Sequence, residues 1–297
     1  MTEHQQALAA DTTEGPAQEP PAQEPPAQES AAQEPAQEPP APKDRRVLRA
    51  ALRWTAAVAV FAVAGAGTAY GITRMERTDV PGLATQSDGR WDYPPLAKPP
   101  LPSGSPGPAA ESNPAGTHHA DLRALLLPLP KGAKENKALR GTDGWLPTGE
   151  FLKEYAEKED REDFGQHLTD SGLRHIAARG WTTGDGTRTR IYLLHFDTAA
   201  VVETRLFLPY FSYKDPARPL RGAEQVEDDA SFPEEKAAVP GVQRSVYDET
   251  APRGAEHDRQ AYLAAGDVLA VVLQSRKGTA HAVPFQQTVV LQSQLLG

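Results

Sequence analysis

The chain has 297 residues, with 31 Lys and Arg against 40 Asp and Glu, and a formal net charge of −9. It contains no cysteine, which excludes disulfides, cysteine-ligated metal centres, a thiol nucleophile and a lipid anchor on cysteine. Its acidity gives no support to general nucleic-acid binding. A length of 297 residues could hold two domains, but prolines concentrate in residues 16–42 and 81–114, and their positions predict one folded domain after them.

Residues 1–42 contain eight acidic residues and no Lys or Arg. The triplet AQE occurs five times there, mostly as PAQEP, and no apolar positions recur that could stack as a solenoid. Such a composition cannot bury a core, which predicts a disordered acidic tail with a polyproline-II bias. The tail is interpreted as a length-tolerant solvated segment, with a docking role as the alternative.

A membrane span is predicted over residues 54–73, which contain no charged residue. Twenty helical residues extend about 30 Å, the thickness of the hydrocarbon core of a bilayer. Trp54 and Tyr70 lie near its ends, where aromatic belts occur. The alternative, a buried helix of a soluble protein, does not fit a position between two proline-rich segments.

The flanking charges predict the orientation of this span. Five basic residues occur in residues 43–53, whereas two follow the span, beside two acidic residues. The positive-inside rule then places the N-terminus in the cytoplasm and the C-terminal bulk outside. A cleaved signal peptide ending near Ala64–Ala66 is the alternative. Gly67 and Gly71 form a GxxxG pair that could bring two such helices together as a dimer.

The outer linker is assigned to residues 74–120, of which 83–116 are expected to be coil. Its prolines and small residues predict a semi-rigid stalk with nothing to pack against. Fully extended, residues 78–120 would reach on the order of 130 Å. Such a stalk would hold a domain away from the membrane, within a cell wall.

Residues 121–297 are predicted to form the extracytoplasmic domain. Its expected order is helix, two strands, helix, three strands and helix, with turns at Gly184–Gly186 and Ala265–Gly266. The predicted elements are a helix around Phe151–Tyr155, strands at 173–181 and 188–196, a helix from Asp197 or Thr198 to about Leu208, strands at 242–247, 259–264 and 267–274, and a helix beginning at Pro284. This order favours the α+β class, with an antiparallel sheet and helices largely on one face.

The run GLRHIAARGWTTGDGTRTRIYLLHFDTAAVVETRLF, together with the later GDVLAVV strand and the closing helix, resembles a recurrent actinobacterial module. It is similar to membrane-anchored envelope proteins of Streptomyces and to the extracytoplasmic sensor domains of mycobacterial Ser/Thr kinases. The resemblance covers residues 121–297 and implies a single-pass envelope protein. The chain departs from the kinase sensors because it lacks disulfide cysteines and a kinase domain.

The sequence contains no serine-nucleophile elbow, P-loop, dinucleotide fingerprint or HExxH motif, so no catalytic residue, metal ligand or cofactor is assigned. His118 and His119 precede Asp121, but adjacent side chains point apart, and an incidental role is preferred. His167, His175 and His195 show no metal-ligand spacing. The loop 214–241 is rich in acidic residues without the order of a calcium loop, and is interpreted as solvated; these residues include Glu224, Glu227, Asp228, Asp229, Glu234 and Glu235.

One candidate ligand-binding region stands out, an aromatic cluster formed by Phe207, Tyr210, Phe211 and Tyr213. Aromatic side chains beside a long loop can line a pocket. Plain core packing is the preferred alternative for these four residues.

Two functions follow as hypotheses. The first is a non-enzymatic membrane protein whose outer domain binds a small ligand, a cell-wall component or an envelope protein. The second is a membrane-tethered hydrolase with dispersed active-site residues, which a convergent acid–base cluster in a deep cleft would support. A transmembrane anti-sigma regulator would need a folded cytoplasmic domain, which the low-complexity tail does not provide.

Overall fold

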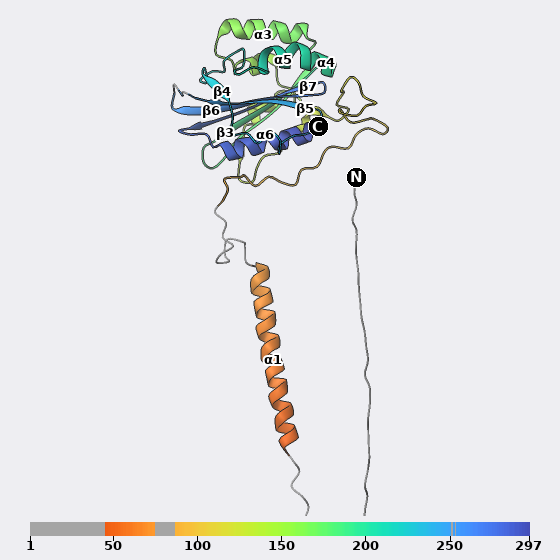
Figure 1. Cartoon of the computed structure of the whole chain (residues 1–297), viewed down its shortest axis with the longest axis vertical. Helices are drawn as coiled ribbons and strands as arrows, with labels where there is room; N and C mark the ends of the chain where they lie inside the picture. The colour runs from red at the N-terminus through yellow and green to blue at the C-terminus, as the bar shows by residue number, and fades with distance from the viewer. Residues whose placement is uncertain (1–44, 75–86, 251, 253) are drawn as a thin grey trace, which may run out of the picture. The chain divides into compact units, whose positions relative to one another are not determined.

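The computed structural model describes residues 45–74, 87–250, 252 and 254–297 (Figure 1). The predicted disordered tail 1–42 therefore lies outside the described residues. The chain divides into two compact units, Met1–Met75 and Glu76–Gly297. Each unit is described by itself.

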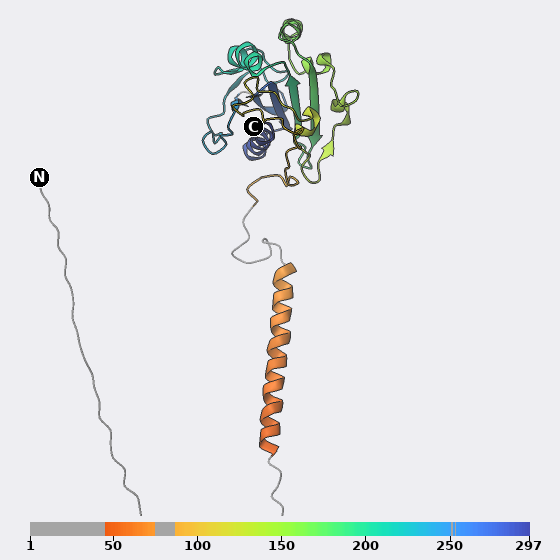
Figure 2. The same cartoon turned by 90° about the vertical axis from the view of Figure 1, so that its right-hand side faces the viewer.

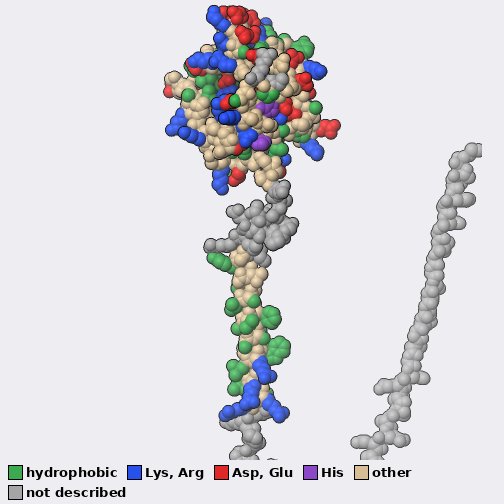
Figure 3. Space-filling model, turned by 90° about the vertical axis from the view of Figure 1, so that its left-hand side faces the viewer, with side chains coloured by type: hydrophobic (Ala, Val, Ile, Leu, Met, Phe, Trp, Pro, Cys, Tyr) green, Lys and Arg blue, Asp and Glu red, His purple; other side chains and the backbone are tan. Residues whose placement is uncertain are grey.

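The described part of the first unit is one helix, α1, Arg45–Arg74. Residues Arg45–Gly71 are long and apolar enough to cross a membrane, with a mean hydropathy of 1.6 in the most apolar stretch. The hydroxyls of Thr55 and Thr68 donate to the carbonyls four residues earlier, each at 2.7 Å, so neither needs water as a partner. Apolar side chains stand out along the helix, and basic ones gather at its beginning (Figure 3).

The second unit is built on a seven-stranded antiparallel sheet with strand order β1-β2-β3-β7-β6-β5-β4. This confirms the predicted α+β class. The strands are β1 Lys134–Glu135, β2 His175–Thr182, β3 Arg188–His195, β4 Val226–Asp228, β5 Val242–Glu249, β6 Glu256–Ala265 and β7 Val268–Lys277. The helices are η2 Leu122–Leu125, η3 Lys137–Arg140, α2 Thr148–Leu152, α3 Lys158–Asp170, α4 Ala199–Val201, η4 Val202–Phe207, α5 Leu208–Phe211 and α6 Ala282–Leu296.

Helices cover both faces of this sheet (Figures 1 and 2). Most of them, including α3 and the α4–α5 segment, lie on one face, and α6 lies on the other. The alternation along β3 explains this arrangement, because successive side chains of a strand point to opposite faces. Tyr192 and Leu194 join the core under α3, whereas Ile191 and Leu193 join the core under α6.

The helix predicted around Phe151–Tyr155 is shorter and is divided. The short α2 ends at Leu152, and the longer α3 begins at Lys158. Phe164 and Leu168 are the buried residues of α3, and the rest of this helix is largely charged. So narrow an apolar stripe gives little periodic signal in the sequence.

Residues 87–121, named the strap here, contain no helix or strand but pack against the domain. The backbone N–H of Trp91 donates a hydrogen bond of 2.8 Å to the side-chain oxygen of Gln287. The side-chain nitrogen of Gln287 donates one of 2.9 Å to the backbone carbonyl of Trp91. The Tyr93 hydroxyl lies 2.9 Å from that of Thr288 on the same helix, α6. The sequence predicted a stalk with nothing to pack, whereas these aromatic residues bind the strap to α6. The folded unit therefore includes residues assigned to the linker.

The long loop 214–241 is also fixed to the sheet. It contains the short strand β4, and its buried Asp229 accepts a hydrogen bond from Arg259 Nη1 at 3.1 Å. Arg259 also donates to Asp248 at 2.7 Å and to the Ala280 carbonyl at 3.0 Å. One acidic residue of the loop thus holds the loop against β6. In the described residues, no group of three or more His, Asp or Glu is arranged to hold a metal ion.

Candidate functional site

The four aromatic residues of the predicted ligand region do not share a pocket. Phe207 and Phe211 lie in the core, and the Phe211 ring stacks on Tyr262 with 3.9 Å between centroids. Tyr210 is half-buried beside the guanidinium of Arg218, and Tyr213 is 64% exposed. None of the four lines a pocket described below. The loop that follows them does line one, of about 550 Å³, between Asp215 and Thr250.

A second pocket next to this loop, the charged pocket, has a volume of about 410 Å³. The two pockets share Glu224. The charged pocket is bounded by the loops around Gly222 and Gly254 and by the sheet. Its polar side chains are three arginines, three acidic residues and a serine: Arg188, Arg190, Arg221, Glu224, Glu256, Asp258 and Ser275.

The strand register brings the charged residues of this pocket together. Ser275 on β7 is opposite Arg188 on β3 and opposite Asp258 on β6, so the three form one row across adjacent strands. Arg190 points to the same face as Arg188, two residues along β3. Its Nη1 and the Arg188 Nε lie 3.5 and 3.4 Å from the Ser275 hydroxyl oxygen. The apolar core continues along this face at Tyr192.

Several of these charges are neutralised within the protein. Arg188 pairs with Glu256, and Arg190 Nε lies 2.9 Å from an oxygen of Glu154. By contrast, the Asp258 carboxylate makes no hydrogen bond or ion pair with any residue that the structure describes, and neither does the Arg221 guanidinium. The charged pocket therefore presents one carboxylate and one guanidinium without partners in the described chain.

Burial raises the pKa of Asp258 to about 6. The positive charge of Arg190 opposes this rise, while the carboxylates of Glu249 and Glu256 add to it. A carboxyl group with such a pKa in a pocket is typical of functional sites, because it changes charge close to neutral pH. Asp258 can accept a hydrogen bond from a cationic group when ionised, or exchange a proton near pH 6.

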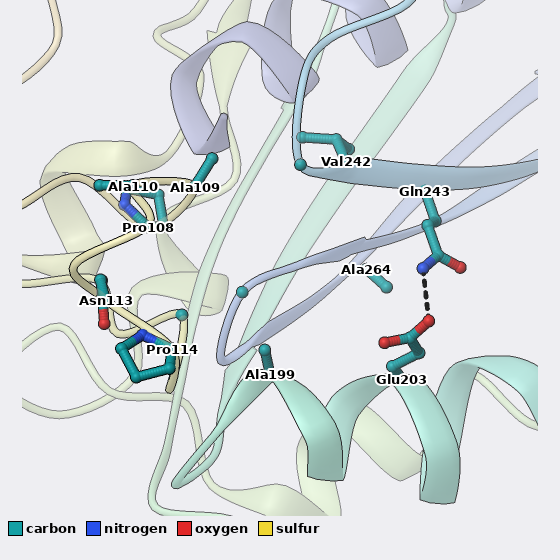
Figure 4. A pocket seen from close by; sticks show the side chains of 13 residues that line it. Pro108, Ala109, Ala110, Asn113, Pro114, Ala199, Glu203, Val242, Gln243 and Ala264 are labelled. Carbon is teal, nitrogen blue, oxygen red and sulfur yellow. Dashed lines mark hydrogen bonds between the residues drawn. The ribbon is translucent and has the colours of Figure 1, made fainter.

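A third pocket, of about 400 Å³, lies between the strap, η4 and the beginning of β5 (Figure 4). Its lining is dominated by small residues and proline. The one charged side chain among its lining residues is Glu203. An oxygen of its carboxylate already accepts a hydrogen bond of 2.8 Å from the Gln243 side chain. This pocket therefore offers less chemistry for recognition than the charged pocket.

A buried histidine–aspartate cluster fastens the end of the strap. Asp267, in the turn between β6 and β7, lies 2.7 Å from His118 Nδ1 and 3.1 Å from His195 Nε2. The other ring nitrogen of His118 lies 2.9 Å from the Leu296 carbonyl at the end of α6. Despite burial, hydrogen bonds from the two histidines lower the pKa of Asp267 to about 2. His118 thus links the strap, the sheet and α6.

This cluster was not predicted from the sequence, where an incidental role is preferred for His118, and His195 shows no metal-ligand spacing. Its members lie 72 and 149 residues from Asp267 in the chain, so no spacing rule indicates it. Asp267 and His195 line none of the pockets described above, whereas His118 lines a separate pocket of about 210 Å³ with Lys98 and Leu295. The geometry assigns the cluster to holding the fold.

No protein-family model matches the chain, and no curated protein matches it. The candidate site therefore depends on its own geometry.

Proposed function

We propose that the chain is a single-pass membrane protein of the actinobacterial envelope, whose outer domain binds a small charged ligand in the charged pocket. The observation that carries this proposal is the Asp258 carboxylate, which shares the pocket with three arginines and has no partner in the described residues. An unpaired charge in a half-buried position destabilises a fold. A ligand of opposite charge would remove that cost.

The length and composition of α1 support the membrane part of this proposal. Five basic residues precede the predicted span, which supports a cytoplasmic N-terminus and an extracytoplasmic C-terminal domain.

Protease added to intact, wall-stripped cells is expected to digest the domain that begins at residue 87 and to spare a tag at the N-terminus. The reason is the bias of basic residues to one side of the span. Immunoblots against tags at both ends measure the outcome. Digestion of the N-terminal tag with a protected domain would reverse the topology, and a strain that secretes a protease-sensitive control protein verifies the treatment.

Charged small molecules are expected to raise the melting temperature of the full chain in detergent micelles at pH 7.5. A panel of carboxylates, amines, phosphate and amino acids covers the charge types that the pocket could accept. At a ligand concentration of about 100 times Kd, stabilisation reaches about 2.7 kcal/mol, or roughly 5–10 °C for a domain of this size. Scanning calorimetry would measure the shift.

The variant Asp258→Asn is expected to abolish this shift, because it removes the unpaired charge and keeps the shape of the side chain. Asp170→Asn is the matched control, since Asp170 is exposed at the end of α3. If no charged compound shifts the melting temperature, or if both variants respond as the parent does, the charged pocket is not the binding site.

The pKa of Asp258 also favours a second candidate function, a tethered hydrolase that uses this carboxyl group for proton transfer. Proton NMR of each ligand that binds distinguishes the two functions. An unchanged ligand supports the binding protein, whereas a cleaved ligand supports the hydrolase.

A further inference from the structure

The charged pocket presents two charged groups of opposite sign that make no hydrogen bond or ion pair with the described residues. Its other charges have partners: Arg188 pairs with Glu256, Arg190 with Glu154, and Glu224 also has an interaction within the chain. Two charged residues remain: Arg221, on the loop around Gly222 that bounds the pocket, and Asp258, on β6. A ligand that satisfies both must carry an anionic and a cationic group.

Ser275, opposite Asp258 in the strand register, adds a hydroxyl group to the pocket. The residue is 2% exposed and lines the pocket. Its oxygen faces two guanidinium groups, from Arg188 and Arg190, which can only donate hydrogen bonds. The hydroxyl hydrogen therefore has no acceptor among the described residues and is available to an anionic group in the pocket.

The size of the pocket limits the ligand. A volume of about 410 Å³ is near the lower end of the range for small-molecule sites. It suits a molecule of the size of an amino acid or a dipeptide rather than a folded protein or a long polymer.

We propose that the charged pocket binds a zwitterion, a free amino acid or a short peptide that has both an ammonium and a carboxylate group. The ammonium group lies against Asp258, and the carboxylate accepts hydrogen bonds from Arg221 and from the Ser275 hydroxyl. A planar guanidinium matches a carboxylate with two parallel hydrogen bonds. This inference rests on the proposed function and adds the chemical class of its ligand.

The binding should depend on pH in one direction. The pKa of Asp258 near 6 means that its charge is present at pH 7.5 and is lost as the pH falls below 6. Glu249 and Glu256 are the acidic groups that act on it, and Arg188 and Arg190 the basic ones. An ammonium ligand therefore binds more weakly at pH 5 than at pH 7.5.

Isothermal titration of the full chain in detergent with alanine and with dialanine tests this proposal. N-acetylalanine lacks the ammonium group, alaninamide lacks the carboxylate, and inorganic phosphate is an anion alone. We expect one or both zwitterions to bind at least ten-fold more tightly than the three comparison compounds. Asp258→Asn should weaken zwitterion binding by about ten- to hundred-fold, the usual effect of losing a charged hydrogen bond.

Arg221→Gln should weaken the binding of zwitterions and leave that of alaninamide unchanged, because only the carboxylate contact is removed. Asp170→Asn, outside the pocket, should change neither. Tight binding of N-acetylalanine or phosphate would assign the pocket to anions, and equal binding of alaninamide would assign it to cations. Either result overturns this inference but leaves the proposed function standing. If no charged compound binds in a way that depends on Asp258, both the inference and the proposed function are overturned.

Discussion

Phe211→Ala is expected to destabilise the outer domain by about 3–5 kcal/mol, the usual cost of truncating a buried phenylalanine. The Phe211 side chain is 1% exposed and stacks on Tyr262 with ring planes 11° apart. Its loss leaves a cavity between α5 and the sheet. The melting temperature of the full chain should fall by roughly 6–20 °C, because each kcal/mol changes it by about 2–4 °C at this domain size.

Tyr213→Ala is the matched control for this change. Its side chain is 64% exposed, and the Tyr247 hydroxyl donates a hydrogen bond of 2.8 Å to its backbone carbonyl. Truncation keeps that bond, so stability should stay within about 0.5 kcal/mol of the parent. Similar losses from Phe211→Ala and Tyr213→Ala would contradict the division of this aromatic cluster into core and surface.

Asp267→Asn is expected to destabilise the domain by about 3–5 kcal/mol, the range for removing one partner of a buried charged pair. The Asp267 side chain is 1% exposed, and two histidines and the His118 backbone N–H depend on its oxygens. The amide of asparagine has one acceptor oxygen in place of two. Chemical denaturation at pH 6 would measure the loss.

The dependence of stability on pH provides a second test of Asp267. Its pKa is lowered from 3.8 to about 2 in the folded protein, so it binds a proton more readily when unfolded. Its contribution is therefore present above about pH 4 and is lost as the pH falls through 2. The free energy of unfolding should lose about 2–3 kcal/mol over that interval.

The variant Asp267→Asn should lack this part of the acid-induced loss, and Asp170→Asn should retain it. If the free energy of unfolding fell by the same amount between pH 6 and pH 2 in the parent protein and in Asp267→Asn, the two histidines would not hold the carboxylate.

Five of the seven strands could be predicted from the sequence because their signals are local. The two short edge strands, β1 Lys134–Glu135 and β4 Val226–Asp228, were not predicted. Alternating apolar residues indicate β3, and Ala265–Gly266 marks the turn between β6 and β7. Thr198 caps the helix that follows β3 as expected, since its hydroxyl oxygen accepts a hydrogen bond from the Val201 N–H. Each of these features depends on residues within a few positions of one another.

The candidate site could not be predicted in the same way. Asp258, Ser275 and Arg188 come from three strands, and only the pairing of those strands places them in one row. The aromatic cluster attracted attention because its members are close in sequence. However, consecutive residues at the end of a helix point in different directions, so Phe211 enters the core and Tyr213 faces solvent.

The packing of the strap on α6 has a mechanical consequence. The strap follows α6 from Gln287, which contacts Trp91, to Gly297, which contacts Lys98. Tension on the chain ahead of residue 87 would load the Trp91 hydrogen bonds first and then the later contacts one after another, so the strap would peel from the domain step by step. Release of residues 87–117 would lengthen the chain by about 100 Å at about 3.3 Å per residue. The sheet would remain folded during this release, and the force would then act on His118 and on its hydrogen bond to Asp267.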